Sequence, residues 1–283
     1  MAEAPELAHG LSIAQLLAAV ENELIPRLMV SHASEGRAVE PDVAPALPDR
    51  GPWATHGEVA TFARWCADGE QQRMHEHVSA LLTRGIGLDA VYLHLLAPAA
   101  RHLGEQWTRD EVGFVDVQLG LCFLHRLVCE CGPIGFRGDA AGTLPAGETR
   151  SIMLGVAPGE MHTFGVTLAA EFFRRHGWQV SNLSGLETDF LLERVATTHY
   201  TAAGFSLYGE TCLDGLAELI HSVRERSCNG ELLVLVGGDF FARHPDMVAE
   251  VGADVSAEDA HRAVFAAERA LAGSRVAAPD RQC

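Results

Sequence analysis

The chain has 283 residues, of which 48% are hydrophobic, so it can form two domains with packed cores. The formal net charge of −17 disfavours direct, non-specific binding to nucleic acid. There is no apolar run of the ~20 residues that a membrane span needs, no signal-peptide pattern, and no regular spacing among the seven cysteines. We therefore expect a cytoplasmic protein with reduced thiols and no membrane partner.

The first predicted element is an amphipathic helix. Apolar residues recur every three or four positions across residues 13–29, which places them on one face of a helix. Four prolines then fall between positions 41 and 52, a pattern typical of an extended tether. We expect an N-terminal helix within residues 1–35 and a proline-rich tether over residues 36–56.

A bundle of about four helices is predicted over residues 57–131. Turn signals interrupt the helical pattern at Asp68-Gly69, between Gly85 and Gly87, and near Asp110. Connections this short favour antiparallel neighbours. His75 and His77 lie two residues apart on one of these helices, so they cannot share a helix face or a metal ion. A glycine-rich linker is expected over residues 132–150.

After Ser151 short apolar runs alternate with helical patterns, and this alternation predicts a parallel sheet with helices on both faces. The expected fold over residues 151–283 is a Rossmann-like, flavodoxin-type domain with five strands. Ligands of such sheets bind beyond the carboxyl ends of the strands. The last helix is expected to open at Ser256, with Glu258 and Asp259 in its first turn. The predicted strands lie within residues 151–158, 178–183, 202–209, 231–238 and 253–257.

The loop after the first strand carries the most informative residues, in the sequence GVAPGEMHTFGV. His162 would stand at the carboxyl edge of the sheet, where an imidazole can coordinate a metal centre. Glu160 can accept a hydrogen bond from the ring, which fixes its tautomer and raises its basicity as a ligand. Gly165 would leave room for a bulky planar ligand at the start of the next helix. The whole candidate loop comprises Glu160, Met161, His162, Thr163, Phe164 and Gly165.

This loop resembles the corrinoid-binding signature Asp-x-His-x-x-Gly, with Glu in place of Asp. The resemblance implies that the cofactor is cobalamin and that His162 replaces its dimethylbenzimidazole as the lower axial ligand of cobalt. Three further elements match the same family in order, and the resemblance implies that they surround the detached nucleotide tail. They are Ser206-Leu207-Tyr208 after the third strand, Gly237-Gly238 after the fourth, and Gly252-Ala253-Asp254 before the last helix.

The predicted bundle resembles the helical cap that precedes corrinoid domains. The resemblance implies that Trp107 lies over the upper face of the corrin. In light-sensing cobalamin regulators of the CarH type, a Glu-His pair follows this tryptophan by ten and eleven residues. Val117 and Gln118 occupy those positions here, so the usual cage for an adenosyl group is missing. We therefore expect aquo- or hydroxocobalamin to be preferred over adenosylcobalamin.

The N-terminal helix, the altered cap and the corrinoid signature together resemble the AerR/PpaA family of antirepressors of photosynthesis genes. The resemblance implies a cobalamin-binding and light-responsive transcription regulator without catalytic residues, whose partner is a DNA-binding repressor of the CrtJ/PpsR type. Two alternatives use the same module. One is a corrinoid protein that carries methyl groups between enzymes, and the other is a haem-binding redox sensor.

A candidate upper ligand comes from the N-terminal segment. His32 follows the predicted helix, and the tether after it, about twenty residues long, can span tens of ångströms at ~3 Å per residue. His32 could therefore reach cobalt from above. Docking or release of the helix would then couple the state of the cofactor to a repressor-binding surface.

Overall fold

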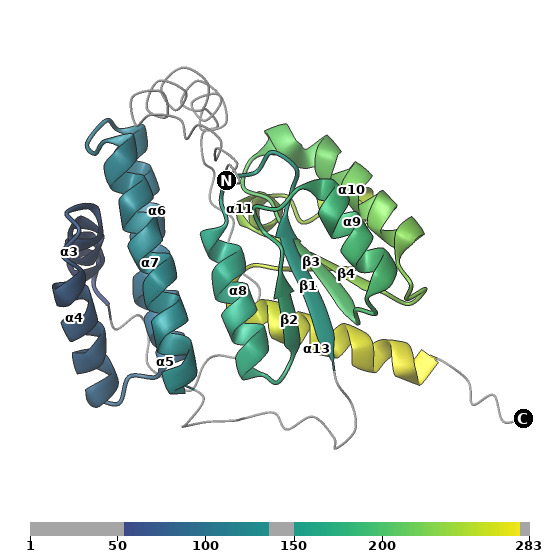
Figure 1. The fold of residues 1–283 in the computed structure, drawn as a ribbon, viewed down its shortest axis with the longest axis horizontal. Helices are drawn as coiled ribbons and strands as arrows, with labels where there is room; N and C mark the ends of the chain where they lie inside the picture. The colour runs from purple at the N-terminus through teal and green to yellow at the C-terminus, as the bar shows by residue number, and fades with distance from the viewer. Residues whose placement is uncertain (1–53, 136–149, 278–283) are drawn as a thin grey trace, which may run out of the picture. The chain divides into compact units, whose positions relative to one another are not determined.

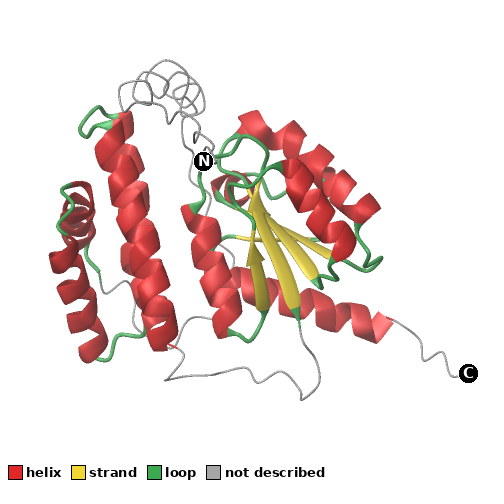
Figure 2. Cartoon of the chain, viewed as in Figure 1, coloured by secondary structure: helices red, strands yellow, loops and turns green. Residues whose placement is uncertain are grey.

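The computed structural model describes residues 54–135 and 150–277, drawn in colour in Figure 1 and by secondary structure in Figure 2. The predicted N-terminal helix, nearly all of the tether and most of the linker lie outside these ranges. The domain boundaries therefore stay predictions. None of the described helices is long and apolar enough to cross a membrane.

The helical part has six segments. Three of them, over residues 88–108, follow one another without a break and form one continuous helix, so the part contains four helices, as the sequence predicts. Each of the predicted turn positions separates two of these helices, and Gly69, Gly85 and Asp110 adopt positive φ angles there. The segments are α3 (His56–Ala67), α4 (Gln71–Thr83), α5 (Leu88–Val91), η2 (Tyr92–Leu96), α6 (Ala97–Thr108) and α7 (Phe114–Gly135).

Local chemistry explains two features of this bundle. Thr55 and Glu58 form a reciprocal capping box that starts α3, with the Thr55 N–H donating to Glu58 at 2.8 Å. The π-helical segment η2 ends just before Pro98. Since proline has no N–H to donate to the carbonyl four residues back, the regular pattern is disturbed there, and Ala97 donates to the carbonyl of Tyr92 five residues back.

The sheet has five parallel strands in the order β2-β1-β3-β4-β5, as the flavodoxin-type prediction requires. Figures 1 and 2 show it between two layers of helices. The strands are β1 (Ser151–Val156), β2 (Gln179–Asn182), β3 (Ala202–Ser206), β4 (Leu233–Gly237) and β5 (Val255–Ala257). The helices are α8 (Phe164–Arg175), α9 (Thr188–Thr197), α10 (Leu213–Arg226), α11 (Asp239–Arg243), α12 (Met247–Glu250) and α13 (Ala260–Ala277), with a 3₁₀ turn, η3 (Glu210–Cys212).

Alternation along the strands divides the buried residues into two cores. Ile152 and Leu154 of β1 join the core that contains α8, α13 and the bundle. Met153, between them, points to the other face and joins the core with α9 and α10. Because successive side chains of a strand point to opposite faces of the sheet, a residue's position along the strand decides which helices it packs against.

The start of the last helix differs from the prediction. Ser256 lies in β5, and α13 begins only at Ala260. The cap is Asp259, whose carboxylate accepts a hydrogen bond from the N–H of Arg262 at 2.7 Å. Ser256 pairs with Val236 of β4, so sheet formation takes precedence over its capping preference. The short elements η3 and α11 were not predicted.

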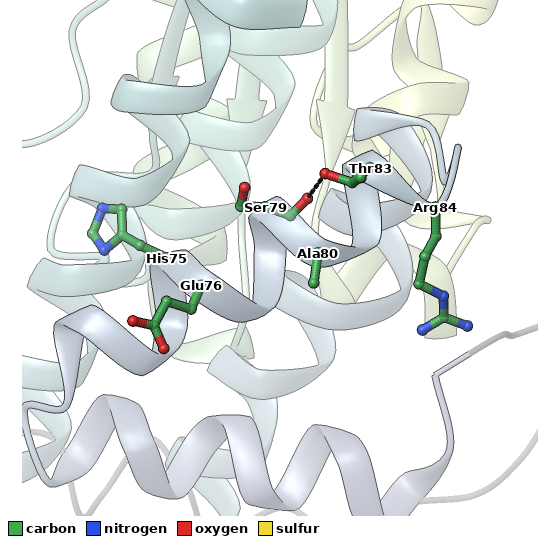
Figure 3. A pocket seen from close by; sticks show the side chains of 6 residues that line it. All are labelled: His75, Glu76, Ser79, Ala80, Thr83 and Arg84. Carbon is green, nitrogen blue, oxygen red and sulfur yellow. Dashed lines mark hydrogen bonds between the residues drawn. The ribbon is translucent and has the colours of Figure 1, made fainter.

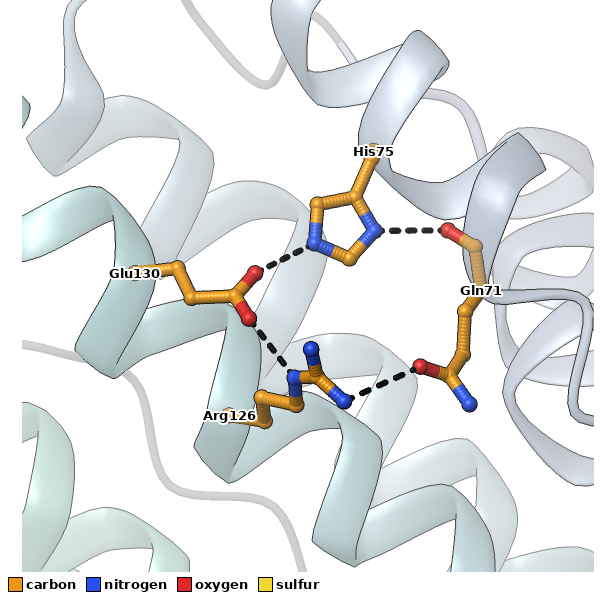
Figure 4. A network of polar contacts seen from close by, with 4 residues as sticks. All are labelled: Gln71, His75, Arg126 and Glu130. Atoms are coloured by element: carbon orange, nitrogen blue, oxygen red, sulfur yellow. Dashed lines mark hydrogen bonds and ion pairs between the residues drawn. The ribbon is translucent and has the colours of Figure 1, made fainter.

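His75 links α4 to α7, whereas His77 lies against Phe62 and Trp65. The two histidines therefore point to different neighbours, as their spacing predicts. The Nδ1 atom of His75 lies 2.7 Å from the carbonyl oxygen of Gln71, and its Nε2 atom lies 2.5 Å from the carboxylate of Glu130 (Figure 4). Both partners are acceptors, so this geometry suits the doubly protonated ring.

The contact between His75 and Glu130 makes stability depend on pH. Hydrogen bonds to Glu130 and Gln71 raise the pKa of His75, although burial and Arg126 act in the opposite direction. The contact stabilises the folded state fully below about pH 6.5, the pKa of histidine in the unfolded chain. This stabilisation is lost as the pH rises through the higher pKa that His75 has in the folded protein. Because both side chains of the pair are in contact with solvent, we expect a small effect.

Thermal unfolding between pH 5.5 and 8.5 measures this effect. The Glu130→Gln variant should show a smaller loss of stability with rising pH than the parent protein. Glu76→Gln removes a carboxylate from α4, the helix that carries His75, and leaves the contact between His75 and Glu130 in place. This variant should keep the parent slope. Equal slopes in the parent protein and Glu130→Gln would contradict the assignment.

Candidate functional site

The loop between β1 and α8 brings Glu160 and His162 to the carboxyl edge of the sheet. Gly159 adopts a φ of +83°, which lets the chain turn sharply after β1. The Glu160 carboxylate folds back over the loop, and its side chain is only 6% exposed. His162 lies beside it with 38% of its side chain exposed. The loop therefore presents an imidazole at the surface and holds its carboxylate partner inside.

Glu160 is the organising residue of this loop. Its Oε1 atom accepts hydrogen bonds from the N–H of Met161 at 2.8 Å, from the N–H of His162 at 3.0 Å and from the His162 ring at Nδ1 at 2.5 Å. Its Oε2 atom accepts from the N–H of Tyr208 at 2.9 Å. Because a carboxylate can only accept, Nδ1 must carry the proton, and Nε2 is the atom that would bind a metal.

The electrostatics of Glu160 agree with this geometry. Burial alone would raise the pKa of Glu160, but the hydrogen bond from the His162 ring and the backbone donors of Tyr208 and His162 outweigh it. The pKa of Glu160 is held at about 2. At neutral pH the residue is therefore a carboxylate that favours the Nδ1–H tautomer of His162.

Tyr208 stacks on His162. The two ring centroids lie 4.1 Å apart, and the ring planes are inclined by 25°. Tyr208 follows β3, so the stack joins the ends of two neighbouring strands. The sequence assigned Tyr208 to the nucleotide tail, and no sequence signal indicated its contact with the histidine.

The carboxyl ends of β3 and β4 bring together four of the predicted site residues, Ser206, Leu207, Gly237 and Gly238. Ser206 pairs with Gly237, and Leu207 donates from its N–H to the Gly237 carbonyl at 3.0 Å. Gly238 has a φ of +97°, and a Cβ there would lie 2.3 Å from the Leu207 carbonyl oxygen. The backbones at Leu207 and residue 238 thus approach so closely that only glycine fits at position 238. At Gly238 the two backbones are in close contact without open space between them, and the assignment of Gly237-Gly238 to the nucleotide tail stays a prediction.

Asp254 does not join the site. Its carboxylate accepts a hydrogen bond from the N–H of Val234 at 2.7 Å and pairs with Arg224 at 2.9 Å. Val234 lies near the amino end of β4, whereas the site lies at the carboxyl end. Asp254 therefore fastens β5 and α10 to the far end of the sheet, away from the loop of His162, and its assignment to the cofactor stays a prediction.

Contacts between α7 and α8 place the cap relative to the loop. His125 of α7 hydrogen-bonds to Thr167 at 3.0 Å and packs edge-on against Phe164. Seven residues further along both helices, a Cβ on Gly132 would lie 2.8 Å from Glu171. The two helices therefore run parallel. The first two turns of α7 extend beyond the start of α8, toward the level of the His162 loop.

The predicted upper-face residues lie in this overhang or just before it. Val117 is 5% exposed and packs in the bundle core, whereas Gln118 is exposed. Trp107 is half-buried, and its ring lies 6.1 Å from that of Phe114. Of the pair Val117 and Gln118, only Gln118 presents a side chain outside the core. His32, the candidate upper ligand, lies outside the described residues.

The described chain also has a pocket away from the predicted site. This shallow pocket follows the surface of α4 and is lined by His75, Glu76, Ser79, Ala80, Thr83 and Arg84 (Figure 3). None of the predicted site residues lines it. Within residues 54–135 and 150–277 there is also no group of three or more His, Cys, Asp or Glu side chains that could hold a metal ion.

The fold and the loop define a class of protein in which a five-stranded parallel sheet presents a histidine loop at its carboxyl edge, with a helical bundle ahead of it in the chain. Residues 150–265 match the family model of the B12 binding domain. The monomethylamine corrinoid protein of Methanosarcina barkeri has the same fold, with a TM-score of 0.60 and 17% identity over 76% of this chain and 100% of that chain.

A relative from Rhodobacter capsulatus, described as an uncharacterized 20.5 kDa protein in the bchF-crtJ intergenic region, is 25% identical over 174 residues. The aligned region covers 62% of this chain and 88% of the relative. Together with the B12 binding domain, this match supports the resemblance to the AerR/PpaA family. The chain is thus AerR/PpaA-like and contains a cobalamin-binding domain.

Proposed function

We propose that this protein is a cobalamin-dependent antirepressor that acts on a DNA-bound repressor of the CrtJ/PpsR type in response to light. The observation that carries the proposal is the buried Glu160 carboxylate, which holds His162 at the carboxyl edge of the sheet with its Nε2 assigned to cobalt. Bound cobalamin would supply a cobalt centre whose upper ligand exchanges under light.

The chain's own residues would hold the cofactor from both sides. Glu160 keeps the proton on Nδ1 of His162 and orients the ring. Gly165 leaves open space at the first turn of α8, because a Cβ there would meet no atom within 4 Å. From above, α7 offers the amide of Gln118 in place of the acid-histidine pair of the CarH type. This difference supports the preference for aquo- or hydroxocobalamin over adenosylcobalamin.

A regulatory role is supported by the relative and by the charge. The Rhodobacter capsulatus relative is described by its place beside crtJ, a gene named like the proposed repressor class. The net charge of −17 favours a basic protein partner over DNA itself. The repressor would therefore be the target, in the cytoplasm, and the protein would regulate photosynthesis genes without catalysing a reaction.

A test of the proposal combines a spectrum with a release assay. The full chain is loaded with hydroxocobalamin, and its effect on a CrtJ/PpsR-type repressor bound to fluorescent operator DNA is followed by anisotropy in darkness and light. We expect a corrinoid spectrum and release of the repressor that depends on both cobalamin and illumination. A haem Soret band in the isolated protein, or methyl transfer by a partner enzyme with no effect on the repressor, would favour one of the two alternatives.

Gly165→Ala tests whether a planar ligand approaches the start of α8. Alanine within a helix is favoured over glycine by about 0.5–1 kcal/mol, so the free energy of unfolding should stay equal or rise. The affinity for hydroxocobalamin should fall, because the new methyl group occupies the open space. A titration followed by absorbance measures the affinity, and denaturant unfolding measures the stability. An unchanged affinity would place the corrin away from Gly165.

A further inference from the structure

We infer that Tyr208 is a positioning residue for the axial ligand, and that its ring fixes the plane of the His162 imidazole. The inference rests on the proposed function insofar as His162 is taken as the cobalt ligand. It adds a second support to the ligand beside Glu160, from the loop after β3, the strand that pairs with β1 ahead of the His162 loop.

The need for a second support follows from the geometry of the first. Glu160 holds the His162 ring at one atom, Nδ1, at 2.5 Å. This hydrogen bond fixes where that atom lies, but a contact at the edge of the ring constrains the tilt of the ring plane only weakly. The ring of Tyr208 lies 4.1 Å away and is inclined by only 25°, so it restricts this tilt by face-to-face contact. Glu160 therefore sets the position and tautomer of the ligand, and Tyr208 sets its plane.

The backbone of Tyr208 is itself firmly held. Its N–H donates to Oε2 of Glu160 at 2.9 Å, and its carbonyl accepts a hydrogen bond from Arg243 of α11 at 3.4 Å. Arg243 in turn pairs with Asp239 at 2.9 Å. The same carboxylate thus holds the backbone of Tyr208 and the ring of His162. The two aromatic rings are fastened to one another through Glu160 as well as through the stack.

The aromatic face, and not the hydroxyl group, is what this role requires. Tyr208→Phe keeps the face and removes the hydroxyl, whereas Tyr208→Leu keeps an apolar side chain and removes the face. Loss of an aromatic stack typically changes an equilibrium by about 3- to 10-fold. We therefore expect Tyr208→Leu to weaken ligation by that factor and Tyr208→Phe to restore it. A purely structural role of the side chain would not alter ligation in a correctly folded variant.

The experiment uses cobinamide, which lacks the dimethylbenzimidazole nucleotide, so that any axial nitrogen must come from the protein. The full chain is loaded with cobinamide and reduced to Co(II), and nitrogen superhyperfine splitting is measured by electron paramagnetic resonance. The parent protein and Tyr208→Phe should show the splitting. In Tyr208→Leu the ratio of nitrogen-ligated to unligated Co(II) should fall by the stated factor, with weaker cobinamide binding. Phe190→Leu, at an exposed aromatic residue on α9, is the matched control and should resemble the parent.

The possible outcomes separate the inference from the proposed function. If the parent protein shows no splitting, His162 is not the ligand and the cofactor assignment fails. If the parent shows it and Tyr208→Leu retains it fully, the positioning role is wrong while the ligand assignment stands. Should thermal unfolding show that Tyr208→Leu is unfolded, Tyr208→Met supplies a second non-aromatic variant for the same comparison. Weak splitting in Tyr208→Phe would also overturn the inference, because the hydroxyl would then be required.

Discussion

Tight cobalamin binding is expected to be lost in the His162→Ala variant, while the fold keeps its stability. Replacing a residue that merely supports a metal ligand typically costs about 10- to 100-fold in affinity, so removing the ligand itself should cost at least about 100-fold. The stability should persist because Glu160 keeps its backbone donors at Met161, at residue 162 and at Tyr208 after the ring is removed. The carboxylate is therefore not left buried without partners.

Titration with hydroxocobalamin, followed by absorbance, checks this prediction, and thermal unfolding of the cofactor-free protein checks the stability. His199→Ala is a suitable control, because His199 is exposed and precedes β3 at the opposite edge of the sheet. It should bind like the parent protein. Full affinity and an unchanged spectrum in His162→Ala would show that cobalt is bound elsewhere.

The succession of strands and helices along the chain and the place of His162 after the first strand could be predicted because both depend on local pattern. Alternating apolar runs and helical periods mark each βα unit, and the carboxyl edge of a parallel sheet follows from the topology alone. The helical break at Asp110 and the turn at Gly159 carry sequence signals of the same local kind. What these patterns encode is the backbone, and they place a residue on an element without saying which way it points.

What the sequence could not predict depends on contacts between distant segments. Asp254 matched a family motif, yet its direction is set by Arg224 and the N–H of Val234, which lie 30 and 20 residues away. Spacing from Trp107 could not show that Val117 packs in the core, since that depends on how α7 rotates against its neighbours. The stack of Tyr208 on His162 joins residues 46 positions apart and has no motif.

Gly238→Ala is expected to produce the largest loss of stability among the glycines of the site. A φ of +97° is unfavourable for any residue with a Cβ, at a typical cost of about 1–2 kcal/mol. The new Cβ would also lie 2.3 Å from the Leu207 carbonyl oxygen and 2.9 Å from the Ser206 hydroxyl oxygen. The carbonyl belongs to the backbone and cannot turn aside like a flexible side chain. Strain and displacement together should cost about 3 kcal/mol or more.

Gly237→Ala and Gly165→Ala are the variants with which the stability of Gly238→Ala is compared. Gly237→Ala places a Cβ 3.2 Å from the Ala257 carbonyl oxygen without a positive φ, so a small loss is expected, and Gly165→Ala should cost nothing. Denaturant unfolding of the three cofactor-free variants should therefore rank them with Gly238→Ala least stable. If Gly238→Ala equals Gly237→Ala in stability, the ends of β3 and β4 are not in the close contact described above.

The same contact decides how the nucleotide tail can be tested. If the tail enters between β3 and β4, the Leu207 carbonyl and Gly238 must separate when cobalamin binds. A bulky residue such as valine at Gly238 would disturb the fold before it disturbed the ligand. Gly237→Ala is milder, so it should weaken cobalamin more than the tail-free cobinamide while the protein stays folded. Equal losses for the two ligands would place the tail elsewhere, and the glycine pair would then serve only the close approach of the two strand ends.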